Sequence, residues 1–157
     1  MVWQCACFPF LLRGYMKRSA AGRPENILVV DDAEPVRKMV CSMLCSSGYQ
    51  CIEAADGVDA LGILKEGSEP IDLVLTDIMM PRMGGTELAC QVAALRPDLP
   101  IVFMSGYSDD PVVRTLECSP ALFLAKPFTA AALNEKVRAA LDNPWTGVPG
   151  AQITSAR

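Results

Sequence analysis

The chain contains no histidine among its 157 residues. This absence removes the Ser-His-Asp and Cys-His schemes, in which imidazole activates a nucleophile, and it excludes a phosphohistidine carrier. Long apolar runs are also missing, because no stretch approaches the roughly 18 apolar residues of a membrane-spanning helix. The sequence therefore predicts a domain that works without imidazole and is not inserted into a membrane.

Charge and cysteine patterns narrow the class of protein further. The net charge is -4, and an acidic domain is a poor general binder of nucleic acid. The charge is uneven, since residues 1–24 carry +4 and the remainder carries -8. The seven cysteines contain no CxxC pair, which argues against structural zinc. We expect them to be reduced, buried thiols in a cytoplasmic protein.

Short apolar runs alternate with helix-length segments from residue 26 onwards. The runs are NILVV, YQCIEA, IDLVLT, PIVFMS and ALFLA, and helices are predicted at 33–47, 57–66, 86–96, 109–118 and 129–141. Strands that are apolar on both faces and alternate with helices predict a parallel sheet covered on both sides. The predicted fold class is therefore α/β, a three-layer sandwich with five strands and five helices.

The first predicted helix has the clearest amphipathic pattern. The apolar residues at i, i+3, i+4, i+7 and i+8 are Val36, Met39, Val40, Met43 and Leu44. We expect Asp32 to cap the N-terminus of this helix. Pro35 falls in its first turn, where proline is tolerated.

We expect one domain, residues 25–142, between two tails. Residues 1–24 have an apolar stretch of only about eleven residues with positive charges after it, the reverse of a secretory signal. A disordered or loosely packed tail is the prediction here, and the remnant of a preceding domain or a misplaced start are the alternatives. Residues 143–157 are short and rich in Pro, Gly and polar residues, so they are predicted as a second tail.

Polar side chains stand where four of the predicted strands end. Asp31 and Asp32 follow the first strand, and Asp77 follows the third. Ser105 ends the fourth strand and Lys126 follows the fifth. In open parallel sheets, function gathers beyond the carboxyl ends of the strands. If the strand order is 2-1-3-4-5, these four strands are neighbours and their polar residues converge on one pocket.

Each of these residues alone has a structural explanation, such as a helix cap, a turn former or a solvated lysine. Together they indicate chemistry, because three neighbouring carboxylates repel one another unless a cation neutralises them. Oxygen ligands without His or Cys suit Mg²⁺, which also takes ligands from water and phosphate. A lysine and a hydroxyl can bind the oxygens of a phosphoryl group. The constellation therefore fits phosphoryl transfer to a carboxylate.

Four segments, ILVVDD, LTDIMMPRMGG, MSGYSDD and FLAKPF, resemble the receiver domain of two-component response regulators in order and spacing. The resemblance covers about residues 26–142 and implies the flavodoxin-like receiver fold with strand order 2-1-3-4-5. ADGVDAL at 55–61 fits the family's usual entry to the second helix. Gly84 departs from the family, which often has Asp or Asn there. We expect Gly84 and Gly85 to let the backbone bend before the third helix.

The resemblance implies a role for each site residue. Asp77 is the implied phosphoacceptor, Ser105 and Lys126 are implied to hold the phosphoryl group, and Phe123 matches the aromatic switch. The implied Mg²⁺ ligands are Asp31, often through water, Asp32, Asp77 and the backbone carbonyl of Met79. The Lys126–Pro127 bond matches one that is cis in the family.

The implied partners are a histidine kinase or phosphotransfer protein as phosphodonor and a downstream protein target that the sequence does not name. No enzymatic activity is expected beyond Mg²⁺-dependent self-phosphorylation and dephosphorylation. Two alternatives remain within the family: a receiver detached from a hybrid histidine kinase, and a vestigial receiver that only binds partners. Outside it, phosphatases of the haloacid dehalogenase type also use a phosphorylated aspartate and Mg²⁺, but they resemble DxDx plus a cap domain, whereas this chain has DDAE.

Overall fold

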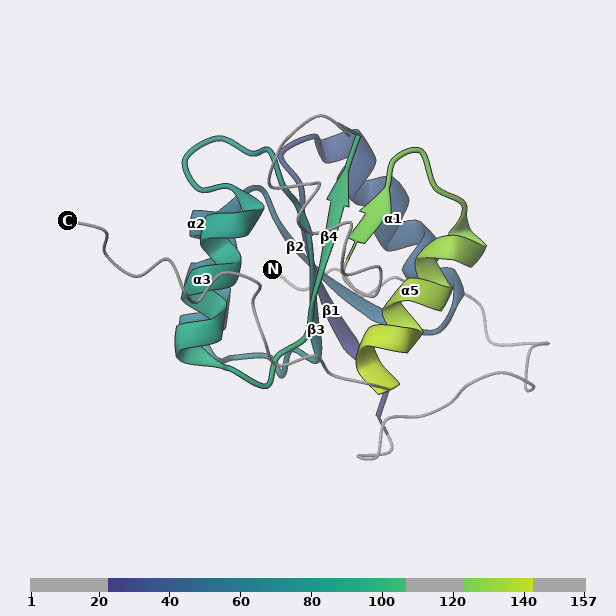
Figure 1. Ribbon diagram of the computed structural model, residues 1–157. Coiled ribbons are helices and arrows are strands. Elements are labelled where there is room, and N and C mark those ends of the chain that lie inside the picture. Colours follow the sequence, from purple (N-terminus) through teal and green to yellow (C-terminus); the bar gives the residue numbers. More distant parts are fainter. Residues whose placement is uncertain (1–22, 107–122, 143–157) are drawn as a thin grey trace.

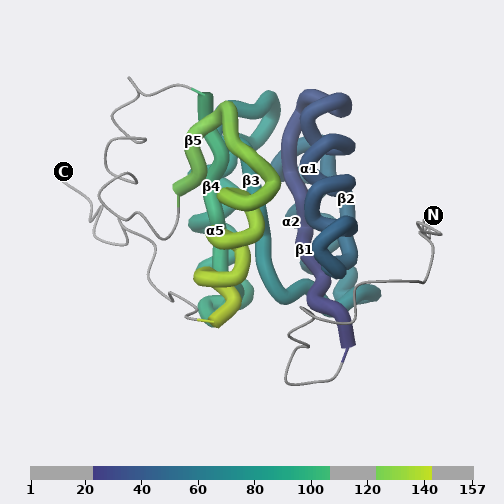
Figure 2. The backbone as a smooth tube through the Cα atoms, turned by 90° about the vertical axis from the view of Figure 1, so that its right-hand side faces the viewer, coloured from purple at the N-terminus to yellow at the C-terminus, as the bar shows by residue number. Residues whose placement is uncertain are grey.

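Parallel strands form a five-stranded sheet at the centre of the molecule (Figure 1). The computed structural model describes residues 23–106 and 123–142. The strands are β1 (Asn26–Val30), β2 (Gln50–Ala54), β3 (Leu73–Asp77), β4 (Ile101–Ser105) and β5 (Phe123–Ala125). They pair in the order β2-β1-β3-β4-β5 (Figure 2), which confirms the predicted order.

Helices cover both faces of the sheet, as the three-layer prediction requires. On one face lie α1 (Glu34–Ser46) and α5 (Ala130–Asp142), and on the other lie α2 (Gly57–Glu66) and α3 (Gly85–Leu95) (Figure 1). These bounds agree with the predicted helices to within one residue at each end. The helix predicted at 109–118 lies outside the described residues.

The core consists of two apolar clusters, one on each face of the sheet. Leu28 and Val30 of β1 belong to the cluster under α2 and α3, whereas Ile27 and Val29 belong to the cluster under α1 and α5. This alternation follows from the two-residue repeat of a strand. Every residue of β1, β3 and β4 is buried, but β2 is partly exposed because it is an edge strand. The three central strands are therefore enclosed by the helix layers on both faces of the sheet.

The expected N-cap of α1 is wrong, and the expected apolar stripe is wrong for one residue, Met39, whereas its other four members lie in or against the core. Its N-cap residue is Ala33, which makes no side-chain capping bond, and the Ala33 N–H donates to the Asp31 carboxylate at 2.9 Å. Asp31 rather than Asp32 therefore organises this turn. The buried side chains of α1 are Val40, Cys41 and Leu44, and Val36 and Met43 pack against the same cluster, but Met39 is 46% exposed. Pro35 does lie in the first turn, as predicted.

None of the four cysteines in the part of the chain that the structure describes forms a disulfide. Cys41 is buried and Cys45 and Cys51 are half-buried, but Cys90 on α3 is exposed. The prediction of buried thiols is therefore wrong for Cys90, because α3 turns this residue away from the sheet. Among the described helices, none has the length and apolar character needed to cross a membrane.

Candidate phosphorylation site

The strands β1, β3, β4 and β5 are neighbours whose carboxyl ends lie at the same end of the sheet (Figure 2). Asp31 follows β1, Asp77 is the last residue of β3, Ser105 is the last of β4, and Lys126 follows β5. The register aligns these ends, since Asp77 pairs with Met104 and Ser105 pairs with Ala125. Parallel pairing alone thus gathers residues from distant parts of the sequence.

The Lys126 ammonium connects two buried carboxylates. Its Nζ donates to Asp31 Oδ2 at 2.8 Å and to Asp77 Oδ1 at 2.6 Å. Asp31 is 1% exposed and Asp77 is 8% exposed. Burial lowers the pKa of Lys126, but the hydrogen bonds to Asp31 and Asp77 outweigh burial, so the pKa is raised above its ordinary value. The lysine is therefore charged and holds the pair together.

The Asp77 carboxylate is fixed at both oxygens. Besides the bond from Lys126, its Oδ2 accepts a hydrogen bond from the Met79 N–H at 2.9 Å. Burial raises the pKa of Asp77 above its usual value, against the opposing effects of the Lys126 hydrogen bond and charge. The carboxylate is thus held in a defined orientation but is poorly solvated, a combination found at functional sites.

Asp32 and Met79 follow the carboxyl ends of β1 and β3 and are more exposed than Asp31 and Asp77. Asp32 is exposed and pairs with no residue in the described part of the chain, and Met79 is 60% exposed. Within residues 23–106 and 123–142, no three acidic or thiol side chains are grouped so as to hold a metal ion. The donors are nevertheless oxygens, which Mg²⁺ prefers, and Lys126 shows that the Asp31–Asp77 pair accommodates a cation.

Ser105 is the last residue of β4, and Phe123 is the first residue of β5. Ser105 is buried, and its backbone carbonyl accepts a hydrogen bond from the Lys126 N–H at 2.8 Å. Phe123 is half-buried, lies opposite Phe103 in the register and packs against the cluster under α2 and α3. The Lys126–Pro127 bond is cis, as the resemblance implies.

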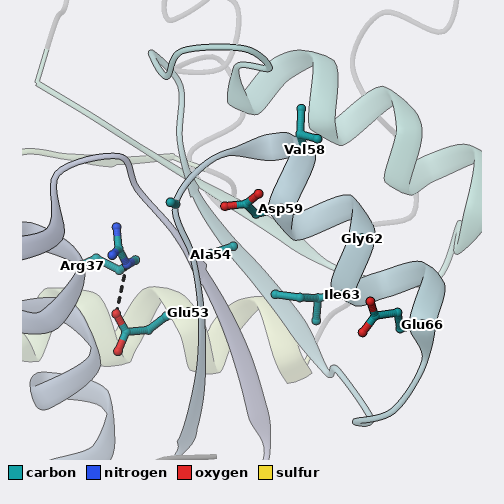
Figure 3. Close-up of a pocket in the computed structure, with 9 residues that line it drawn as sticks. Arg37, Glu53, Ala54, Val58, Asp59, Gly62, Ile63 and Glu66 are labelled. Carbon is teal, nitrogen blue, oxygen red and sulfur yellow. Dashed lines mark hydrogen bonds and ion pairs between the residues drawn. The ribbon is translucent and has the colours of Figure 1, made fainter. Parts of the chain in front are cut away.

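Arg37 of α1 binds the backbone of the turn that contains Asp31 and Asp32. Sequence reasoning did not identify this residue. Its Nη1 donates to the backbone carbonyl of Asp31 at 2.5 Å, and its Nε donates to Glu53 of β2 at 3.0 Å (Figure 3). The sequence signal was an arginine one turn into the helix that follows the acidic pair. Arg37 thus ties the end of β1 to the edge strand beside it.

The two glycines at the start of α3, Gly84 and Gly85, are explained by the little space around them rather than by an unusual backbone conformation. Gly84 has an ordinary extended backbone, with φ -75° and ψ 167°. A Cβ on Gly85 would lie 2.2 Å from the backbone oxygen of Asp77. The expectation that these glycines allow a bend is therefore wrong. Gly85 is needed because a larger residue would prevent α3 from starting against the end of β3.

The family model of the response regulator receiver domain matches residues 27–138. The chain belongs to this family. Among its relatives, this receiver is 37% identical over 118 residues to the sensor kinase CckA of Brucella abortus, covering 74% of this chain and 12% of the kinase. It is 36% identical over 118 residues to the probable transcriptional regulator ycf27 of Porphyridium aerugineum, covering 74% of this chain and 48% of the regulator.

A solved structure extends the likeness to the fold. The response regulator protein TrrA from Thermotoga maritima, in complex with Mg²⁺-BeF, has a TM-score of 0.63 and 33% sequence identity with this receiver. The match covers 73% of this chain and 96% of that chain. The flavodoxin-like receiver fold is therefore confirmed.

Family membership defines the function at a coarse level. Receivers are the phosphoacceptor domains of two-component signalling, so this chain is a phosphorelay signalling domain. It spans between about a tenth and a half of the length of the two curated relatives described above. Because both a kinase and a regulator are similar to it, the comparisons do not favour the alternative of a receiver detached from a hybrid kinase.

Proposed function

We propose that this receiver accepts a phosphoryl group on Asp77 from the phosphohistidine of a histidine kinase or phosphotransfer protein. The observation that carries the proposal is the Asp77 carboxylate at the end of β3, fixed by Lys126 and by the Met79 N–H. In the transfer, an Asp77 oxygen bonds to phosphorus while the bond from phosphorus to the donor histidine nitrogen breaks. Positioning and charge stabilisation are all that the protein must supply.

The proposed Mg²⁺ ligands are Asp31, Asp32, Asp77 and the backbone carbonyl of Met79. Bound Mg²⁺ would neutralise negative charge on the phosphoryl oxygens. Lys126, whose ammonium already lies on Asp77, is placed to pair with another of these oxygens, and Ser105 is the proposed hydroxyl donor. The oxygen-only donor set supports this assignment, as does the Mg²⁺-BeF bound to the related protein TrrA.

The receiver is further proposed to comprise residues 25–142, to act in the cytoplasm and to have no activity beyond its own phosphorylation and dephosphorylation. Its output would be a changed surface, started at Ser105 and Phe123 and recognised by a downstream protein. Nucleic acid is not a proposed partner, because the net charge of this chain is -4.

Acetyl phosphate and intact-mass measurement test the proposal. We expect the wild-type protein to gain the mass of one phosphoryl group in Mg²⁺ and to gain none after the metal is removed with EDTA. Asp77→Asn should abolish the gain, because an amide cannot act as the nucleophile. Asp98→Asn, which changes an exposed aspartate, is the matched control and should behave like wild type. Phosphorylation of Asp77→Asn at the wild-type rate would contradict the assignment.

A further inference from the structure

The loop that follows Asp77 contacts the turn that begins α2. The Gly57 N–H donates to the Met83 carbonyl at 3.1 Å. Arg82, the residue before Met83, forms ion pairs with Asp56 and with Asp59. Figure 3 shows Asp59 on the first turn of α2. The β3–α3 loop and the β2–α2 turn, far apart in the sequence, are thus joined by a backbone bond and by charge.

Asp56 is the inner half of this junction. The residue is 3% exposed, and its Oδ1 accepts hydrogen bonds from the N–H groups of Val58 at 2.8 Å and Asp59 at 3.0 Å. Its Oδ2 accepts from Arg82. Burial acts to raise the pKa of Asp56, but the amide bonds and the guanidinium outweigh it, so the pKa lies below its usual value. Removing Arg82 would leave a buried carboxylate without its counter-charge.

Arg82 is the outer half, and its backbone is strained. Its φ is 61°, in the left-handed region that disfavours residues other than glycine. Such a conformation persists where its surroundings over-determine it. The surroundings here include Met83, which fits closely against Gly57, since a Cβ on Gly57 would lie 2.6 Å from Met83 Cγ. The path of the loop is therefore fixed on both sides of Arg82.

The same loop carries Met79, whose N–H is bound to Asp77 Oδ2 at 2.9 Å. We propose that Asp56 and Arg82 form a clamp that positions Met79 on Asp77, so that two residues outside the pocket orient the phosphoacceptor. They are positioning residues, because neither bonds to Asp77. The consequence for phosphorylation rests on the proposed function, but the consequence for the Met79 amide does not.

Asp56→Asn and Arg82→Ala test the clamp, with Asp59→Asn as the matched control. Asparagine keeps the helix-capping acceptor at position 56 but removes the charge. Asp59 is the exposed partner of Arg82, with 44% of its side chain accessible, and such pairs contribute little. In Mg²⁺-free protein, we expect hydrogen exchange at the Met79 amide to become about tenfold faster in both clamp variants, and the chemical shift of this amide to change. In the control variant, exchange at this amide should become less than about twofold faster.

Phosphorylation by acetyl phosphate in Mg²⁺ should slow by about tenfold in both clamp variants. The double variant should be no worse than either single change, because both remove one shared interaction. Arg82→Gly, which relieves the left-handed strain but also lacks the ion pair, should resemble Arg82→Ala. If Arg82→Ala fails to fold, Arg82→Gln replaces it and should give the same tenfold effects, because glutamine keeps much of the side chain but removes the charge that pairs with Asp56.

The clamp would be overturned if the clamp variants show faster hydrogen exchange at the Gly57 amide, which means that the junction is open, while exchange at the Met79 amide keeps its wild-type rate. Wild-type protection of Met79 in Arg82→Gly would overturn it as well, since the ion pair would then be unnecessary. A wild-type protein that takes up no phosphoryl group would contradict the proposed function instead. The exchange measurement needs no phosphorylation, so the two failures are distinguishable.

Discussion

Asp31 and Asp77 share a single ammonium group, that of Lys126, at the carboxyl ends of β1 and β3. Two buried carboxylates and one cation leave an excess negative charge in a poorly solvated place. Burial accordingly raises the pKa of Asp77 in the folded protein. Residues kept for function commonly cost stability in this way. At the residue scale, the site is therefore expected to trade stability for a reactive carboxylate.

Asp77→Asn should raise the free energy of unfolding at pH 7 in EDTA by about 1 kcal/mol. Because the pKa of Asp77 is raised in the folded state, the wild-type protein loses stability as pH rises from the usual Asp value, about 3.9, through the raised value. Asparagine does not ionise, so its advantage should appear above this window and disappear below it. Urea denaturation at neutral and acidic pH measures the difference, and a less stable Asp77→Asn at pH 7 would contradict it.

Sequence reasoning predicted which polar residues would lie at neighbouring strand ends, because strand ends can be read along the chain, as Asp31, Ser105 and Lys126 illustrate. It could not separate Asp31 from Asp32 in the turn before α1, since neighbouring residues point in different directions and only the three-dimensional path decides which is buried. Arg37 and Arg82 were missed for a related reason. Their partners, such as Glu53 and Asp56, are distant in sequence, and no local pattern pairs them.

At the scale of elements, the start of α3 depends on its contact with the end of β3. The Gly85 N–H donates to the Ile78 carbonyl at 3.0 Å, and the Gly85 Cα faces the Asp77 backbone so closely that no Cβ fits. The bounds of the four helices in the described part of the chain were predicted to within one residue from the pattern of the sequence. The reason for Gly85 was not, because a close approach between two elements leaves no periodic trace in the sequence.

Two glycine-to-alanine changes in helices should have opposite effects on stability. Gly85→Ala should lower the free energy of unfolding by about 2 kcal/mol, since its Cβ would meet the Asp77 backbone oxygen at 2.2 Å. Gly62→Ala in α2 should raise it by about 0.5–1 kcal/mol, because nothing lies within 4 Å and alanine favours the helix. Thermal and urea unfolding compare the two. Equal effects on the free energy of unfolding would show that the close approach of Gly85 to the Asp77 backbone does not restrict which residue can begin α3.

At the scale of the whole molecule, the pocket and the β4–β5 edge of the sheet are directly connected. The Lys126 N–H is bound to the Ser105 carbonyl, and Phe123 stands two residues before the end of the three-residue strand β5. Phe123 is half-buried against the core, so it has both an anchored and an accessible side. A phosphoryl group adds nearly two negative charges and can bias a surface with two packings of similar energy.

Beryllofluoride, which mimics the phosphoryl group on Asp77, should change amide chemical shifts at Phe123 as well as in the pocket. The expected path runs from the mimic through the Ser105 hydroxyl to the aromatic ring. Ser105→Ala should reduce the shift at Phe123 by about half or more, and Ser46→Ala, an exposed serine on α1, should leave it unchanged. Changes confined to the pocket, or a full-sized Phe123 shift in Ser105→Ala, would show that the path does not exist.

The position of Lys126 in the chain has a consequence for biosynthesis. This residue lies 95 residues after Asp31 and 49 after Asp77, and it follows the last strand of the sheet. During synthesis, Asp31 and Asp77 are therefore translated well before Lys126, whose ammonium group pairs with them in the folded protein. Non-local contacts of this kind form late in folding, because a long loop must close first. The contacts of Lys126 with Asp31 and Asp77 thus exist only in a molecule whose strands have all been made and paired, so a chain that is still being synthesised lacks an intact site.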